Sequence, residues 1–522
     1  MRNRSRRVAA LVAATVVSSL LLPDVEAQTS HAAARADPPR FADPDRRAKL
    51  ATAFPEIDRI FREYVEGARV PGAAWGILVD GEFVHAGASG VRELVTRSPV
   101  DADTVFRIAS MTKSFTALAI LKLRDERRLA LDDPAERYVP ELAGLAYPTT
   151  DSPKITIRHL LSHSAGFPED NPWGDQQLAI SDEEMARLMR DGIPFSSPPG
   201  VAYEYSNFGY AILGRIVARA SGMPYRDFVT TEILRHLGLA STTLDPMAVP
   251  PDRLARGYRW EDDQWKEEPP LADGAFGAMG GMLMSIRDLA TYVGFLMSAW
   301  PARDDPGIAP VSRATLREMQ QVWRTRPATA TTSSDGSIQL SASGYGFGLR
   351  VTQTATLSAI VGHAGGLPGY GSLMLWLPEH GVGLVAAGNL TYTSWGPRFD
   401  AAFEALRRTG GLQPRLPQPS PALVAARDAV SRLVVDWDDE LADEMAADNL
   451  FVDRSKGRRR ADLEALRRRH GTCRPDGSFD VENALRGQWT LRCDRGAVRV
   501  AITLSPTMPP RVQSLSVRSL DP

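Results

Sequence analysis

The sequence predicts an α+β protein: a mostly antiparallel sheet flanked by helices, with an all-helical insertion, followed by a small C-terminal α+β domain. Strand patterns occur early, at 73–90, and return late, at 344–389, whereas helical patterns fill most of 109–300. Terminal segments that pair into one sheet leave the helical middle packed beside it. A Gly- and Pro-rich stretch over 410–421 then separates a second set of helix and strand patterns.

Length and composition are those of a globular protein with a sizeable core. The chain has 522 residues, of which 43% are hydrophobic and 24% charged, so we expect one large and one small domain. A net charge of −2 gives no electrostatic basis for binding nucleic acid or an anionic membrane. We therefore expect a small-molecule or peptide substrate and no nucleic-acid partner.

The N-terminus predicts export. Four arginines precede an apolar run of about 15 residues, shorter than the roughly 20 that a membrane span needs, and small residues then surround a cleavage point near Gln28. We expect residues 1–27 to be a cleaved signal peptide and 28–50 a flexible N-terminus. The mature protein would be periplasmic or extracellular, without an integral membrane span.

The main domain is expected over 51–409. It begins with a helix near 52–67 and a hairpin whose turn is Asp80-Gly81. Loops at 164–175 and 194–204 interrupt the helical middle, and the polar stretch 324–343 predicts a mobile surface loop. Strands follow in "GYGFGLRV", "GSLMLWLP" and "VGLVAAGN", and an amphipathic helix at 399–408 closes the domain.

The stretch "FRIASMTKSF" places Ser110 three residues before Lys113, at the start of a helical pattern. Residues three apart on a helix share a face, so the amine can reach the hydroxyl. Lysine is rare here, occurring only at 49, 113, 122, 154, 266 and 456, and unlike arginine it can lose its proton when desolvated. The pattern indicates a serine nucleophile with its base. In the alternative interpretation, Ser110 caps the helix and Lys113 is a solvated charge.

A second candidate, Tyr205-Ser206-Asn207, joins a Pro-rich loop to a helical pattern. A phenol near ammonium groups can have its pKa lowered and shuttle a proton, and an amide can orient a substrate. In the alternative interpretation, Tyr205 packs in the core and Asn207 caps the helix.

A third candidate is "GHAGGLPGYGS", 362–372, which leads into a strand. The glycines around His363 allow the backbone to approach a ligand. A backbone N–H here, together with that of Ser110, would form an oxyanion hole. In the alternative interpretation, this is a Gly-rich turn with an exposed histidine.

Together the three stretches resemble the serine β-lactamase and penicillin-binding-protein superfamily. The resemblance is to its class C-like branch, which also holds D-Ala-D-Ala carboxypeptidases, D-aminopeptidases and family VIII esterases. "SMTK" matches Ser-x-x-Lys, "YSN" matches Tyr-x-Asn, and "HAG" stands where many members have Lys-Thr-Gly and this branch often has His-x-Gly. Order and spacing agree, and the resemblance covers about residues 50 to 408.

The resemblance implies the chemistry of three residues. Ser110 would be the acylated nucleophile, Lys113 the base that helps to deprotonate it, and Tyr205 a second proton shuttle. The identity of the acylation base is disputed among relatives, so we treat Lys113 and Tyr205 as a coupled pair.

The resemblance also implies the substrate-binding residues. Asn207 would contact the substrate amide, and His363 would occupy the position of the third-motif lysine. Gly365 and Gly366 would line the same strand, with the N–H of Gly366 and that of Ser110 binding the oxyanion.

The presence of histidine at position 363 decides which function we expect. A histidine is largely neutral at pH 7, so the constant charge that would hold a substrate carboxylate is missing. We therefore expect an esterase or D-amino-acid peptidase that works through an acyl-enzyme. The alternatives are a class C-like β-lactamase or D-Ala-D-Ala carboxypeptidase, and a non-catalytic ligand-binding or sensor protein on the same fold.

No cofactor or metal is expected. His159 and His163 have the spacing of a helical zinc pair, but Leu160 stands where a metalloprotease has Glu. The Gly-x-Ser-x-Gly elbow of the α/β-hydrolases does not occur in the sequence.

The C-terminal domain is expected over 422–522. Helical patterns at 422–434, 439–447 and 458–470 precede strands near 487–493, 496–504 and 511–518, and Cys473 and Cys493 are candidates for a disulfide. The domain resembles the cone-shaped fold of nuclear transport factor 2-like modules. Because it has no catalytic cluster, we expect it to bind a partner.

Overall fold

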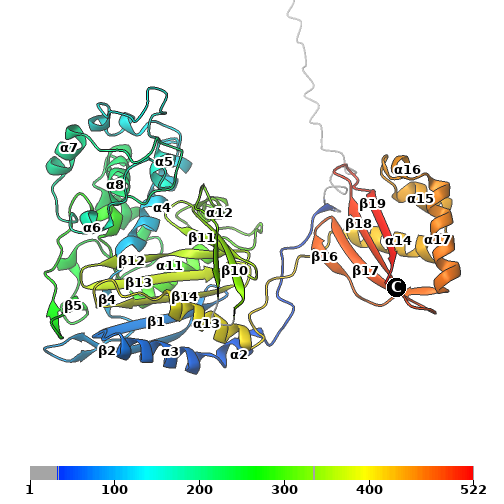
Figure 1. Cartoon of the computed structure of the whole chain (residues 1–522), viewed down its shortest axis with the longest axis horizontal. Coiled ribbons are helices and arrows are strands. Elements are labelled where there is room, and N and C mark those ends of the chain that lie inside the picture. The colour runs from blue at the N-terminus through cyan, green and yellow to red at the C-terminus, as the bar shows by residue number, and fades with distance from the viewer. Residues whose placement is uncertain (1–31, 33, 308, 333–335, 521–522) are drawn as a thin grey trace, which may run out of the picture. The chain divides into compact units, whose positions relative to one another are not determined.

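A computed structural model describes residues 32, 34–307, 309–332 and 336–520 (Figure 1). The chain forms two compact units. The larger one covers Phe41–Arg415, and the smaller one contains Leu416–Pro522 together with the segment before Phe41. Within the described residues, no helix combines the length and the apolar character needed to cross a membrane. The predicted signal peptide lies outside the described residues.

The larger unit is built on a ten-stranded sheet in which the strands pair in the order β3-β2-β1-β14-β13-β12-β11-β10-β8, with β9 beside β10. All these pairings are antiparallel. The strands are β1 (Gly72–Val79), β2 (Glu82–Glu93), β3 (Ser98–Pro99), β8 (Arg324–Thr325), β9 (Thr329–Thr332), β10 (Ile338–Tyr345), β11 (Arg350–Thr354), β12 (Ile360–Leu367), β13 (Tyr370–Leu377) and β14 (Val382–Gly388). Early and late segments therefore share one sheet, and the predicted fold class is confirmed.

Strand β1 shows why the sheet has a core on each face. Successive side chains of a strand point to opposite faces. Trp75 and Ile77 pack in the core with helices α3 (Phe54–Gly67) and α13 (Gly396–Arg408), whereas Leu78 belongs to the core on the other face. The predicted Asp80-Gly81 turn joins β1 to β2 with positive φ at both residues, 56° and 82°.

The other face carries the helical part, seen above the sheet in Figure 1. Helix α11 (Ile286–Met297) contacts β1 and β14, and α4 (Thr112–Asp125) packs on α8 (Asn207–Ser221). The remaining elements are α5 (Ile157–Leu161), α6 (Asn171–Gly174), α7 (Asp182–Asp191), α9 (Tyr225–Val229), α10 (Gly277–Gly280), α12 (Arg313–Met319) and the strand pairs β4 (Val105–Arg107) with β7 (Leu283–Ser285) and β5 (Tyr258–Glu261) with β6 (Gln264–Glu267).

Two segments differ from the predictions. The expected loop over 324–343 contains β8, β9 and part of β10, because backbone pairing with neighbouring strands needs no apolar side chains. Of the expected flexible segment 28–50, the residues from Phe41 onward belong to the larger unit, where α2 (Arg46–Ala51) begins with a buried arginine. Arg46 donates a hydrogen bond of 3.0 Å to Asp80.

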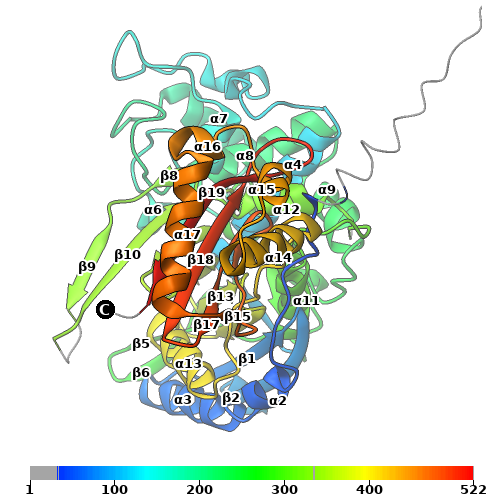
Figure 2. The same cartoon turned by 90° about the vertical axis from the view of Figure 1, so that its right-hand side faces the viewer.

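The smaller unit places helices on one face of a five-stranded antiparallel sheet (Figure 2). The helices are α14 (Pro421–Val435), α15 (Asp439–Met445), α16 (Leu450–Asp453) and α17 (Lys456–His470), and the strands are β15 (Cys473–Pro475), β16 (Asp480–Asn483), β17 (Arg486–Cys493), β18 (Ala497–Leu504) and β19 (Val512–Ser519). Cys473 faces Cys493 across β15 and β17, and the two form a disulfide.

Candidate active site

Ser110 lies in the short 3₁₀ turn Ala109–Met111 that connects β4 to α4, and its side chain is buried. The residue before it, Ala109, has a φ of 49°. Non-glycine residues in this left-handed region are costly and tend to occur at functional sites. Because α4 starts two residues after Ser110, Lys113 lies one turn further on, with Nζ 3.1 Å from Ser110 Oγ.

Lys113 is completely buried and donates to three oxygens. Besides Ser110 Oγ, these are Asn207 Oδ1 at 2.6 Å and the carbonyl oxygen of Met279 at 2.8 Å. Burial lowers the pKa of Lys113 to about 7, against the negative charges of Asp175 and Asp170, which raise it. A substantial fraction of the amine is therefore neutral near pH 7 and able to accept a proton.

Tyr205 precedes α8 and packs close to both Lys113 and His163. Lys113 Nζ is 4.8 Å from the centre of its ring, and the His163 ring centre is 4.2 Å away. Burial raises the Tyr205 pKa well above 10, although interaction with Ser110 opposes this shift. The sequence-based expectation of a lowered phenol pKa is therefore wrong, because desolvation outweighs the interactions with Ser110 and Arg350 that lower the pKa.

Asn207 links Lys113 to Asn171 and Asp175 in the helical part. Its Oδ1 accepts from Lys113, while Nδ2 donates to Asn171 at 3.1 Å and to Asp175 at 3.4 Å. The side chain is fully buried. Its contacts in the structure thus orient the lysine, whereas the sequence predicts a contact with the substrate amide.

Asp170 fixes the start of α8 from a separate loop. Its carboxylate accepts from the backbone N–H of Asn207 at 2.6 Å and of Phe208 at 2.8 Å. Ser206 adds its own cap by accepting from the N–H of Gly209 at 3.1 Å. Two side chains therefore satisfy N–H groups that a helix start leaves unpaired.

His363 lies on β12 and is buried. Its Nδ1 lies 2.6 Å from the carbonyl oxygen of Ala364, which can only accept, so Nδ1 carries the proton. The Nε2 atom then accepts from the Tyr345 hydroxyl at 2.8 Å. Burial, followed by the charges of Arg350 and Lys113, lowers the His363 pKa well below 6.5. The ring is neutral, and both nitrogens have protein partners.

The glycines after His363 let β12 approach the Ser110 turn closely. A Cβ atom at Gly365 would lie 2.1 Å from the carbonyl oxygen of Ile108, and one at Gly366 would lie 2.7 Å from the Tyr392 ring. Ser372 on β13 also donates to that Ile108 oxygen at 2.9 Å. No larger residue fits at Gly365 without displacing the strand from the nucleophile.

The structure adds residues that sequence reasoning missed. Asp175, Tyr345, Tyr392 and the Met279 carbonyl all contact the predicted residues, but each comes from a segment without a motif of its own. His163, weighed as half of a zinc pair, accepts through Nδ1 from the N–H of Ser206 at 3.1 Å. Of the missed groups, only the Met279 carbonyl lies in a stretch that stands out in the sequence, because glycines surround it in "GAMGGM".

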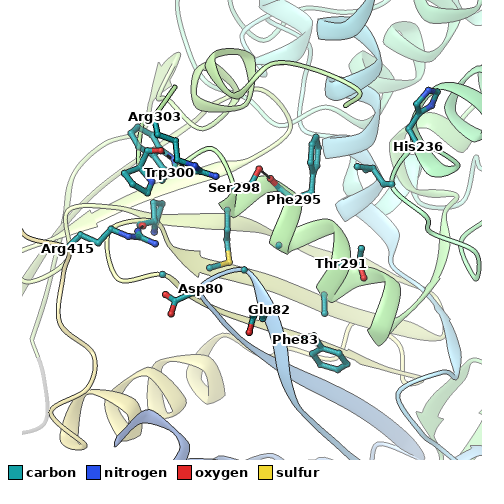
Figure 3. Close-up of a pocket in the computed structure, with 18 residues that line it drawn as sticks. Asp80, Glu82, Phe83, His236, Thr291, Phe295, Ser298, Trp300, Arg303 and Arg415 are labelled. Atoms are coloured by element: carbon teal, nitrogen blue, oxygen red, sulfur yellow. Dashed lines mark hydrogen bonds between the residues drawn. The ribbon is translucent and has the colours of Figure 1, made fainter. Parts of the chain in front are cut away.

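Cavity size alone does not point to this site. A cavity of about 640 Å³ lies between α11 and the β1–β2 hairpin and is lined by Asp80, Glu82, Phe83, Phe295 and Trp300 (Figure 3). None of the three motifs contributes to it.

In comparisons with known proteins, the family match falls on the larger unit of the chain. A family model described as Beta-lactamase matches residues 57–408. Penicillin-binding protein 4* of Bacillus subtilis (strain 168) is 27% identical over 320 residues, covering 59% of this chain and 66% of that protein. Beta-lactamase of Lysobacter lactamgenus is 27% identical over 378 residues, covering 69% of this chain and 93% of that protein. Esterase EstB of Burkholderia gladioli is 30% identical over 240 residues, covering 43% and 58%.

The chain thus spans just under two thirds of the penicillin-binding protein and little more than half of the esterase. Among solved structures, an octameric penicillin-binding protein homologue from Pyrococcus abyssi shares the fold, with a TM-score of 0.57 and 22% identity over 89% of this chain and 95% of that one. Because the family model accounts for more than half of the sequence, the chain belongs to the beta-lactamase family.

Proposed function

We propose that the protein cleaves an ester or amide, as an esterase or D-amino-acid peptidase, through an acyl-enzyme on Ser110. Lys113 and Tyr205 are its proton-transfer residues. The observation that carries this proposal is the 3.1 Å separation of Lys113 Nζ from Ser110 Oγ, at a buried amine whose pKa is about 7. A general base works best when its pKa lies near the working pH.

Acylation starts when neutral Lys113 takes the proton from Ser110 Oγ while that oxygen bonds to the substrate carbonyl carbon. The backbone N–H groups of Ser110 and Gly366 stabilise the oxyanion, and each such donor contributes about 3 to 4 kcal/mol. The leaving oxygen or nitrogen takes a proton from Tyr205, whose raised pKa keeps the phenol protonated. Lys113 then returns the serine proton to Tyr205.

Deacylation uses the same residues in reverse. A water molecule gives a proton to the Tyr205–Lys113 pair as its oxygen attacks the acyl carbon. Ser110 Oγ leaves and takes that proton back, which releases the acid and restores the enzyme.

A second candidate, a class C-like β-lactamase or D-Ala-D-Ala carboxypeptidase, is favoured by Arg350. This exposed residue at the start of β11 pairs in register with Gly362, beside His363. Its charge contributes to lowering the pKa values of His363 and Tyr205. Arg350 thus supplies the permanent positive charge that a neutral His363 lacks, and guanidinium groups bind carboxylates well.

One substrate panel separates these candidates. Wild type and Ser110→Ala are assayed on p-nitrophenyl esters, D-amino-acid amides, a D-Ala-D-Ala peptide and nitrocefin. We expect turnover of an ester or amide that Ser110→Ala abolishes, and full activity in that variant would overturn the mechanism. Turnover restricted to the carboxylate-bearing substrates would select the second candidate. If neither a fluorophosphonate nor a fluorescent penicillin labels Ser110, the non-catalytic alternative is favoured.

We also infer that the protein is exported to the periplasm or the cell exterior. Support comes from the signal-like sequence of residues 1–27 and from the Cys473–Cys493 disulfide, since disulfides persist mainly in oxidising compartments. The N-terminus of protein recovered outside the cytoplasm is expected near Gln28. Uncleaved protein confined to the cytoplasm would contradict export.

A further inference from the structure

The sheet of the smaller unit has one face without helices. Along β17 and β18, alternate side chains enter the core, among them Trp489, Leu491, Val498 and Val500. Because successive side chains of a strand alternate between faces, the residues between them point to the opposite face. Figure 1 shows helices α14 and α17 on the core side of this sheet. We call this opposite side the outer face.

Four arginines cross the outer face, and we call them the arginine row: Arg474, Arg492, Arg499 and Arg518. They come from the adjacent strands β15, β17, β18 and β19. Arg474 is directly opposite Arg492, and Arg499 is directly opposite Arg518. Arg492 pairs with Ala497, which makes Arg499 its diagonal neighbour. All four are exposed.

Most of the charge of the row has no partner, although Arg492 attracts the exposed carboxylate of Asp476 and helps to lower the pKa of that group. In the part of the chain that the structure describes, none of its four side chains makes a hydrogen bond or an ion pair. The arginines of α17, on the other side of the sheet, differ: Arg460 pairs with Glu464 and Arg467 with Asp436. Like charges directly opposite on a sheet are destabilising. Two such pairs in succession therefore cost stability unless an anion binds between them.

We propose that the arginine row is the binding surface for a linear polyanion that carries a phosphate on each repeating unit. Four adjacent strands place the charges along about 14 Å, and guanidinium groups bind phosphate oxygens in pairs. The domain thus anchors the hydrolase to an anionic polymer. This inference does not depend on the reaction proposed for Ser110.

The surroundings of the row favour a linear polymer over a flat anionic membrane. Beside it on the outer face, Glu482 pairs with Arg486, and Asp480 accepts from Gln488. Arg486 already neutralises Glu482, but the Asp480 carboxylate has an uncharged partner and would repel a broad anionic surface while leaving the strip along the row free.

The same surroundings disfavour nucleic acid. The outward residues next to the row are small or polar: Gln488, Thr490, Ala501, Thr503, Ser514 and Ser516. Proteins that bind single strands use aromatic side chains on which the bases stack, and these positions hold none.

The test measures binding of the full-length protein to long-chain inorganic polyphosphate at several salt concentrations. We expect Arg492→Ala/Arg499→Ala to weaken binding at least tenfold and to reduce the slope of log K against log salt by about two. The matched control, Arg460→Ala/Arg467→Ala, removes two paired arginines and should change binding less than twofold. Equal binding by the row variant and wild type would overturn the proposal.

Two further measurements keep the result interpretable. Thermal melting identifies a row variant that has unfolded. In that case Arg518→Gln, on the edge strand β19, is tested instead, and it is also expected to weaken polyphosphate binding. Tighter binding to vesicles containing anionic lipid, or to single-stranded DNA of equal charge, would overturn the linear phosphate polymer as the ligand. Ser110-dependent hydrolysis is expected to be unchanged in row variants, so failure here is distinguishable from failure of the proposed reaction.

Discussion

The Tyr392 hydroxyl donates a hydrogen bond of 3.0 Å to Oδ2 of Asp175, which joins the loop after β14 to the helical part of the larger unit. The other oxygen of Asp175 accepts from Asn207, and Asn207 accepts from Lys113. A chain of hydrogen bonds therefore leads from a half-exposed tyrosine beside Gly366 to the amine beside Ser110.

Asp175→Asn should shift the pH dependence of hydrolysis to lower pH. The negative charge of Asp175 raises the pKa of Lys113, so its removal lowers that pKa further below its usual value. Because the base acts in its neutral form, the acid limb of kcat/KM should move down by about half a pH unit or more. The measurement is kcat/KM from pH 5 to 9.

Asp133→Asn is the matched control for that experiment. Asp133 also accepts from a tyrosine, Tyr138, at 2.7 Å, but its charge is not among those that shift the Lys113 pKa. Its acid limb should stay at the wild-type position. An unmoved limb in Asp175→Asn would show that Asp175 does not tune Lys113.

Lys113→Arg should remove activity while keeping a positive charge at the site. Arginine cannot be deprotonated in proteins, so it cannot act as the base. We expect kcat/KM to fall about 10²- to 10⁴-fold, the usual contribution of general base catalysis. Lys122→Arg, on the same helix and paired with Glu126, is the control and should remain active. The readout is the acylation burst with a p-nitrophenyl ester, and a normal burst in Lys113→Arg would rule out this lysine as the base.

The motifs could be predicted from the sequence because the residues that act together within each motif are only a few positions apart. Ser110 and Lys113 are one helical turn apart, and the Asp80-Gly81 turn fixes its own hairpin. The pKa of Tyr205 could not be predicted, since it depends on burial by side chains from distant segments. Asp175 and Tyr345 were missed for the same reason.

Strand β9 shows a second limit of prediction from the sequence. Its residues Thr329–Thr332 are all exposed, so no hydrophobic alternation marks them. They form a strand because their backbone pairs with β10. The polar composition therefore predicts a loop, whereas backbone pairing with the neighbouring strand makes this segment part of the sheet.

Gly365→Ala should reduce both stability and activity. The added Cβ would lie 2.1 Å from the Ile108 carbonyl oxygen, which forces β12 away from the Ser110 turn. Overpacking of this kind costs about 1 to 3 kcal/mol. Gly396→Ala is the control, because a Cβ there meets nothing within 4 Å. Thermal melting and ester turnover should both fall only in Gly365→Ala, and a stable, fully active variant would contradict the close approach.

His363→Lys, which introduces the lysine of the third family motif, should destabilise the fold instead of creating a penicillinase. The side chain is buried, and the charges of Arg350 and Lys113 already disfavour a cation there. A lysine with a lowered pKa in the folded state binds fewer protons than in the unfolded state, so stability should rise with pH above that lowered pKa and up to the unfolded value near 10.4. Melting temperatures from pH 6 to 9 should therefore climb in His363→Lys but not in His363→Gln. Equal slopes in both variants would show that position 363 tolerates a charge, and nitrocefin turnover by the lysine variant would then become the expected result.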